Sequence, residues 1–108
     1  MKKLVSGRGV SRGEARGIVR LVFSDADASD FKEGDVLVTR ITDPTMVIMM
    51  GKASAIVCDI GGMTSHPSIV AREMGIPCIV ACKNATAVLK NGMNVLVSGD
   101  KGEVYLME

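Results

Sequence analysis

The 108-residue chain contains no tryptophan, only three aromatic residues and only three cysteines. So few rings argue against a platform on which nucleic-acid bases stack. The cysteine count is odd and no Cys-x-x-Cys pair exists, which argues against a disulfide framework and against a zinc site. We therefore expect Cys58, Cys78 and Cys82 to be reduced, buried, small apolar side chains.

Long hydrophobic runs are also absent. Apolar runs such as Met46–Met50 are far shorter than the roughly 20 residues of a membrane-spanning helix, and the basic N-terminus lacks the apolar stretch of a signal peptide. Hydrophobic residues nonetheless make up 47% of the chain and its net charge is only +1, which excludes intrinsic disorder. We expect a single soluble, cytoplasmic domain over residues 1–108, with no membrane partner.

Common nucleotide- and metal-binding motifs are missing too. The sequence has no P-loop, HExxH, EF-hand or GxSxG pattern, and Arg12 occupies the third glycine position of a dinucleotide fingerprint begun by residues 7–9. Charge is uneven, because the first 20 residues carry six Lys or Arg residues against Glu14, and an acidic stretch follows. Such a basic segment could contact nucleic acid or an acidic partner, but we favour a solvated face balanced by the acidic loop.

The hydrophobic pattern predicts a mixed fold. Apolar and β-branched residues indicate strands over 17–23, 36–42, 53–58, 77–82, 94–98 and 103–106, the last two joined by a turn at 99–102. Helices are expected over 44–50, after Asp43-Pro44, over about 65–74, ended by Gly75, and as a short turn within 84–90. The first helix is apolar nearly all round, which predicts burial. The alternation predicts a parallel pair of strands with helices on one face.

Residues 61–68 (GGMTSHPS) concentrate the groups capable of chemistry and include His66, the only histidine. We expect a glycine loop followed by a helix N-terminus, whose unpaired N–H groups and dipole favour anions. Thr64 and Ser65 add hydroxyls, and neutral imidazole is a nucleophile, as phosphoryl transfer to His66 would require. The alternative is that His66 is an ordinary capping or surface residue and that Arg72 and Glu73 form a solvent-facing pair.

Residues 61–77 (GGMTSHPSIVAREMGIP) resemble the signature around the phosphorylated histidine of the phosphoenolpyruvate-utilising enzymes. The similar domain is the mobile, swivelling phosphohistidine domain of phosphoenolpyruvate synthase, pyruvate phosphate dikinase and enzyme I. Residues 34–38, 42–44, 55–59, 84–86, 91–92 and 98–104 are similar to further elements of the family, so the resemblance covers roughly residues 10–106. The sequence departs from the pattern at Pro67-Ser68, where the family usually has Ala-Ala, and at Arg12, which replaces a proline.

The resemblance implies an α/β fold, namely a single compact swivelling β/β/α domain of mixed sheet with short helices. It implies that His66 is the catalytic residue, which takes a phosphoryl group from one active site and delivers it to another. It assigns phosphate-binding or supporting roles to Gly61, Gly62, Thr64, Ser65 and Arg72.

Those supporting roles differ in kind. Thr64 would hydrogen-bond the phosphohistidine, and the two glycines would let the backbone approach the phosphate closely. Ser65 would cap the helix and add a donor. Arg72 lies more than one turn beyond His66, so it would reach a phosphate only if the fold bends it back.

The family's nucleotide-binding domain and phosphoenolpyruvate/pyruvate-binding barrel do not fit within 108 residues. We therefore expect them on a separate chain, with Mg²⁺ and phosphoenolpyruvate or ATP bound there and no metal or cofactor bound by this domain. In this interpretation the domain is a phosphoryl carrier that is not catalytically complete alone. The competing interpretation is a non-catalytic regulatory or interaction domain that binds a partner or small anion at the His66 helix N-terminus.

Overall fold

The computed structural model describes residues 1–107, apart from the side chain of Asp25. Its eight strands are β1 (Lys2–Ser6), β2 (Arg8–Ser11), β3 (Glu14–Leu21), β4 (Val36–Thr39), β5 (Ala55–Cys58), β6 (Cys78–Val80), β7 (Asn94–Ser98) and β8 (Glu103–Leu106). Its helices are the 3₁₀ segments η1 (Asp25–Asp30) and η2 (Pro44–Met46) and the α-helices α1 (Val47–Lys52), α2 (His66–Met74) and α3 (Ala85–Val88).

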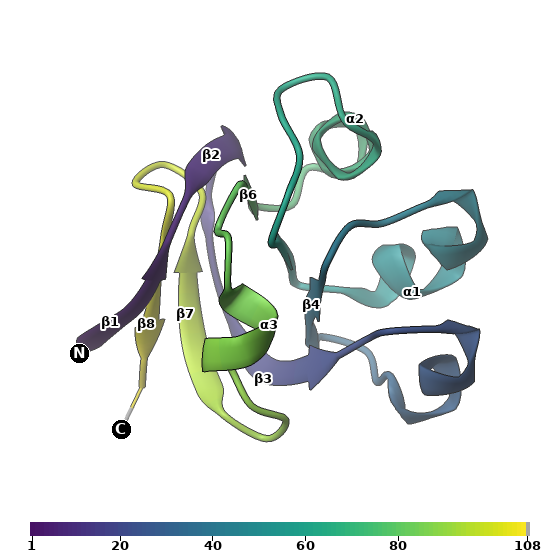
Figure 1. Ribbon diagram of the computed structural model, residues 1–108, viewed down its shortest axis with the longest axis horizontal. Helices are drawn as coiled ribbons and strands as arrows, with labels where there is room; N and C mark the ends of the chain where they lie inside the picture. Colours follow the sequence, from purple (N-terminus) through teal and green to yellow (C-terminus); the bar gives the residue numbers. More distant parts are fainter. Residues whose placement is uncertain (108) are drawn as a thin grey trace.

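The strands form one sheet in the order β1-β8-β7-β3-β4-β5-β6-β2. Strands β3 to β6 run parallel, whereas β1, β8, β7 and β3 pair antiparallel, as does β2 with β6. The long β3 belongs to both parts, and the sheet bends there into two layers (Figure 1). This arrangement confirms the expected mixed sheet and its parallel central strands.

Side-chain alternation along the parallel strands builds two cores, because successive residues point to opposite faces. Val36 and Val38 of β4 enter the core between the two sheet layers, to which α3 also contributes, and Leu37 enters the core beneath η2, α1 and α2. Strands β5 and β6 alternate in the same way. Both faces of these strands are therefore apolar, which explains their continuous hydrophobic sequence and produces the β/β/α layering.

Glycines close the corner between the first two strands. Strands β1 and β2 lie at opposite ends of the strand order although only Gly7 separates them in sequence. The Gly7 N–H donates to the Gly102 carbonyl at 2.8 Å. A Cβ atom on Gly9 would lie 1.9 Å from the Gly99 carbonyl oxygen, so the backbones cross at a distance that no side chain permits.

Several sequence predictions need correction. Strands β1 and β2 were not predicted, although five of the six basic side chains of the first 20 residues are exposed, as a solvated face requires. The helix predicted over 44–50 is a 3₁₀ turn followed by α1, and it is not wholly buried, since Ile48 is 76% exposed and Val47 is also exposed. Strands predicted over 36–42 and 77–82 end at Thr39 and Val80, and Ala81 beyond the second takes a left-handed backbone conformation (φ +57°).

Strand β3 begins at Glu14 and ends at Leu21, against the predicted 17–23, and β5 begins at Ala55, against the predicted residue 53. The hairpin of β7 and β8, the short helix after Asn84 and the end of α2 at Gly75, which has φ +72°, are confirmed. No helix among residues 1–107 combines the length and apolar character needed to cross a bilayer.

The crossing at Gly9 predicts a sharp difference between two glycine-to-alanine substitutions. Gly9→Ala should destabilise the fold by about 3 kcal/mol or more, because backbone would have to move. Gly51→Ala, in α1 with open space around its Cβ position, should stabilise by about 0.5–1 kcal/mol through helix propensity. Urea unfolding measures both, and equal effects would contradict the close backbone approach.

Candidate functional site

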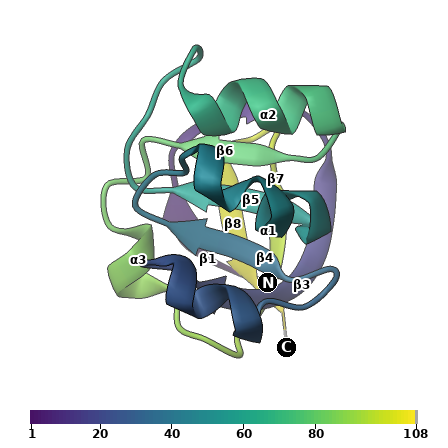
Figure 2. The ribbon, with the colours of Figure 1, turned by 90° about the vertical axis from the view of Figure 1, so that its right-hand side faces the viewer.

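His66 is the first residue of α2 and follows the loop that leaves the carboxyl end of β5. The helix lies across β6, as Figure 2 shows, and also packs on β5 and β2. Pro67 stands in its first turn, where the missing N–H costs no hydrogen bond. The expected helix start is therefore confirmed, and Pro67 does not disturb it.

One ring nitrogen of His66 is held by a neighbouring loop. Thr42 Oγ1 lies 2.8 Å from His66 Nδ1, and Thr42 is itself buried. Thr42 follows β4, whose end is joined to the end of β5 by the Ile60 N–H to Arg40 carbonyl bond at 3.2 Å. Parallel pairing of β4 and β5 thus brings the two loops together. Within residues 1–107, Nε2 of the half-buried ring has no hydrogen-bond partner.

The loop before the helix is organised around the carbonyl oxygen of Gly62. This oxygen accepts the Ser65 N–H at 3.2 Å, the Ser65 hydroxyl at 2.8 Å and the Ser68 hydroxyl at 2.6 Å. Ser68 is fully buried. Ser65 stands at the N-cap position, yet its side chain makes no capping bond to the helix. The expectation that Ser65 caps α2 is therefore wrong, since its hydroxyl closes the loop instead.

Arg72 braces the same loop from the far end of the helix. Its guanidinium donates to the Met63 carbonyl at 2.6 Å and to the Val10 carbonyl of β2 at 3.0 Å. The fold thus brings Arg72 back to the site through the loop backbone. Its fork ties the loop to the edge strand β2.

The bracing leaves a group of hydrogen-bond donors free. The Thr64 side chain is exposed and makes no hydrogen bond with any described residue. The backbone amides of Met63, Thr64 and His66 likewise have no acceptor within the described chain. These donors lie at the N-terminus of the nine-residue helix α2, whose dipole adds positive potential. The loop therefore offers donors to an anion held near His66.

Asp43 follows Thr42 and lies close enough to His66 for the two side chains to interact electrostatically. The hydroxyl and backbone N–H of Thr45 donate to its carboxylate and, together with the nearby His66, lower the pKa of Asp43. The carboxylate thus stays ionised and caps η2.

Comparisons with known proteins identify the family of the chain. The family model "PEP-utilising enzyme, mobile domain" matches residues 31–102, which include every site residue named above except Val10. The chain belongs to this family. The mobile domain is also 53% identical over 104 residues to a probable phosphoenolpyruvate synthase of Archaeoglobus fulgidus and 50% identical over 102 residues to the phosphoenolpyruvate synthase of Pyrococcus furiosus.

These relatives are much longer than the mobile domain. The matches cover 96% and 94% of the chain but only 14% and 12% of the two relatives. An enzyme I solution structure superimposes with a TM-score of 0.62 at 35% identity, over 72% of this chain and 32% of the other. Holo aconitase X of Thermococcus kodakaraensis has a TM-score of 0.72 at 23% identity over 96% and 98% of the chains, which shows a shared fold alone.

Sequence reasoning missed two residues of the mobile domain's site. Thr42 matches the family pattern, which gives it no role, and the structure places it in the loop after β4, just before the Asp43-Pro44 helix start. Ser68 was noted only as a departure from Ala, yet its buried hydroxyl holds the Gly62 carbonyl. Neither contact can be read from sequence spacing, because each depends on how two loops fold together.

The three cysteines are free and buried, as expected. Residues 1–107 contain no group of three or more His, Cys, Asp or Glu side chains arranged to hold a metal ion. Burial raises the pKa of Cys78 and of Cys82 to about 12 and the pKa of Cys58 well above its usual value. These thiols are packing groups of the mobile domain.

The two loop glycines should respond differently to alanine. Gly61 has φ +123°, and a Cβ there would lie 2.9 Å from Ser65 Oγ, so Gly61→Ala should cost about 1–3 kcal/mol. A Cβ on Gly62 meets no atom within 4 Å, so Gly62→Ala should change stability by less than about 0.5 kcal/mol. Urea unfolding tests the pair. A large loss at Gly62 would show that its backbone, too, needs glycine.

The raised thiol pKa values predict slow alkylation of the folded domain. Because the thiolate is the reactive form, a pKa near 12 should slow labelling at pH 8 by at least about 1000-fold relative to a free thiol. Iodoacetamide labelling followed by mass spectrometry should find three reactive thiols in urea and none in buffer. Rapid native labelling of any one would refute its assignment as a packing group.

Proposed function

We propose that His66 accepts a phosphoryl group on Nε2 from a donor bound to a partner domain and delivers it to a second active site. The bond of Thr42 to Nδ1 at 2.8 Å carries this proposal, because it orients the ring and leaves Nε2 without a partner in residues 1–107. Family membership supports it.

The transfer needs one tautomer of the histidine. In this tautomer Nδ1 carries the proton and its N–H donates a hydrogen bond to Thr42 Oγ1. Nε2 then holds the reactive lone pair. The Nε2–phosphorus bond forms while the bond between phosphorus and the leaving oxygen breaks, and that oxygen keeps the electron pair. The proton stays on Nδ1. Delivery to the acceptor reverses these events.

The donors of the loop stabilise the transferred group. The free Thr64 hydroxyl and the amides of Met63, Thr64 and His66 can donate to phosphoryl oxygens, and the α2 dipole favours their negative charge. Gly61 gives the loop its shape, and Gly62 leaves space for the phosphoryl group above its backbone. Ser65 and Arg72 fix the shape of the loop, because they donate hydrogen bonds to the carbonyl oxygens of Gly62 and Met63.

The rest of the reaction takes place on other domains. We propose that a nucleotide-binding domain and a phosphoenolpyruvate/pyruvate-binding barrel, with Mg²⁺ and phosphoenolpyruvate or ATP bound there, exchange the phosphoryl group with His66. The small share of the synthases that this chain spans supports this division of labour. We further propose that transfer occurs in the cytoplasm.

Substitutions of His66 and of Thr42 should distinguish the chemical role of the imidazole from the orienting role of the Thr42 hydroxyl. After incubation with phosphoenolpyruvate or ATP and lysate of the source cells, intact mass should show one acid-labile phosphoryl group on the native chain and none on His66→Ala. Thr42→Val, which keeps the side-chain shape but removes the hydroxyl, should fold and become phosphorylated ~10- to 100-fold more slowly.

Three outcomes would contradict the proposal. Phosphorylation of His66→Ala would place the acceptor elsewhere, and an unchanged rate in Thr42→Val would remove the orienting role of Nδ1. No phosphorylation of the folded native chain under any condition would instead support a regulatory domain that binds a partner or anion at the same helix N-terminus.

A further inference from the structure

A small pocket opens beside the segment that carries Thr42. Its volume is about 280 Å³, and Ile41 and Asp43, the two neighbours of Thr42, both contribute to its wall. This volume lies just below the range of sites for drug-sized ligands, so it suits the end of one side chain. Because Thr42 holds His66, an occupant of the pocket would sit close to the histidine.

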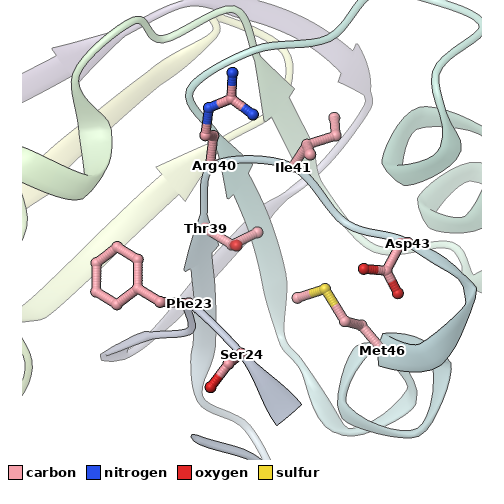
Figure 3. A pocket seen from close by; sticks show the side chains of 7 residues that line it. All are labelled: Phe23, Ser24, Thr39, Arg40, Ile41, Asp43 and Met46. Carbon is pink, nitrogen blue, oxygen red and sulfur yellow. The ribbon is translucent and has the colours of Figure 1, made fainter.

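The groups that face the pocket define its chemistry. Figure 3 shows the Asp43 carboxylate directed toward the pocket and the Thr39 hydroxyl between Phe23 and Met46. Thr39 is only 4% exposed, and its hydroxyl makes no hydrogen bond with any residue in the described chain. Phe23 is 69% exposed, although aromatic rings are usually buried. The carboxylate and the unused hydroxyl therefore face the pocket together, and the exposed Phe23 ring borders it on the side away from Asp43.

The chain does not fill this pocket with a cation of its own. Arg40 borders it, but Figure 3 shows the guanidinium turned away from Asp43. The two belong to no ion pair among those found in residues 1–107. The lowered pKa of Asp43 keeps the carboxylate charged at neutral pH, so an anion entering the pocket would meet negative charge.

We propose that this pocket receives an arginine side chain of the partner domain that docks over His66. A planar guanidinium carries a fork of N–H donors, so it can donate to the Asp43 carboxylate and to the Thr39 hydroxyl, which both face the pocket. A lysine ammonium offers the charge without this flat fork of donors. The contact would align the partner with the histidine, because pocket and His66 share the segment 41–43.

The identity of the occupant as a partner side chain rests on the proposed carrier function, whereas the preference of the pocket for guanidinium does not. The test therefore has two parts. The first titrates ¹⁵N-labelled protein with N-acetyl-arginine methylamide and compares the lysine and glutamate analogues. It uses the native chain, His66→Ala, Asp43→Asn, Thr39→Val and, as a charge-matched control, Glu33→Gln, an exposed residue outside the pocket.

We expect millimolar, saturable binding of the arginine probe, with shifts centred on Thr39 and Asp43. Asn retains the capping of η2, so Asp43→Asn should fold and bind at least about fivefold more weakly. Thr39→Val should also weaken binding, while Glu33→Gln and His66→Ala should bind like the native chain. No saturable shift at the pocket, equal binding of the glutamate probe, or equal effects of Asp43→Asn and Glu33→Gln would overturn the inference.

The second part measures phosphorylation in lysate as a function of domain concentration. Thr39→Val should raise the concentration for half-maximal rate several-fold and leave the maximal rate unchanged, as expected for a lost docking contact. A fall in maximal rate alone would assign Thr39 a structural role and overturn the docking role. Failure of phosphorylation with intact probe binding would count against the partner and the carrier function, and would leave the guanidinium preference standing.

Discussion

The hydrogen bond between Thr42 and His66 is the contact on which the site depends. It joins two residues 24 positions apart, on loops that leave adjacent parallel strands. The 2.8 Å distance between Thr42 Oγ1 and His66 Nδ1 depends on the register of β4 and β5. It also depends on the start of α2 at His66, beside the loop that follows β4. The two apolar cores therefore help to position the histidine, because they fix the strands from which both loops emerge.

The serines and the arginine around the histidine work on the backbone. Ser65 and Ser68 both donate to the Gly62 carbonyl, and Arg72 donates to the Met63 carbonyl. A hydroxyl used in this way is no longer available to a ligand. The loop gains a fixed shape in exchange, and that shape leaves several amides and the Thr64 hydroxyl open. Such preorganised donors stabilise developing charge better than mobile side chains, since they need little reorganisation.

The sequence predicted the elements better than it predicted their contacts. Strong signals such as Pro67, Gly75 and the continuous apolar run of β5 located α2 and the central strands, because propensity and burial agree there. The crossing at Gly7 and Gly9 was missed, since glycine–glycine contacts between distant strands leave no periodic pattern. Ser65 was assigned a cap from its position, but the competing acceptor at Gly62 appears only when the loop is folded. Longer-range geometry decided each of these cases.

The fold alone does not determine the chemistry. A chain with the same fold, aconitase X, shares only 23% identity over nearly its whole length, so the layers tolerate very different sequences. In the present chain, His66 and Thr42 lie on loops after the carboxyl ends of β5 and β4, and the pocket proposed for arginine lies beside Thr42, where residues that follow β3 and β4 line it. A carrier must be recognised and must react through one small surface. In the proposed carrier, the position of Asp43 beside Thr42 would meet both needs, because a partner that engages the pocket would lie close to His66.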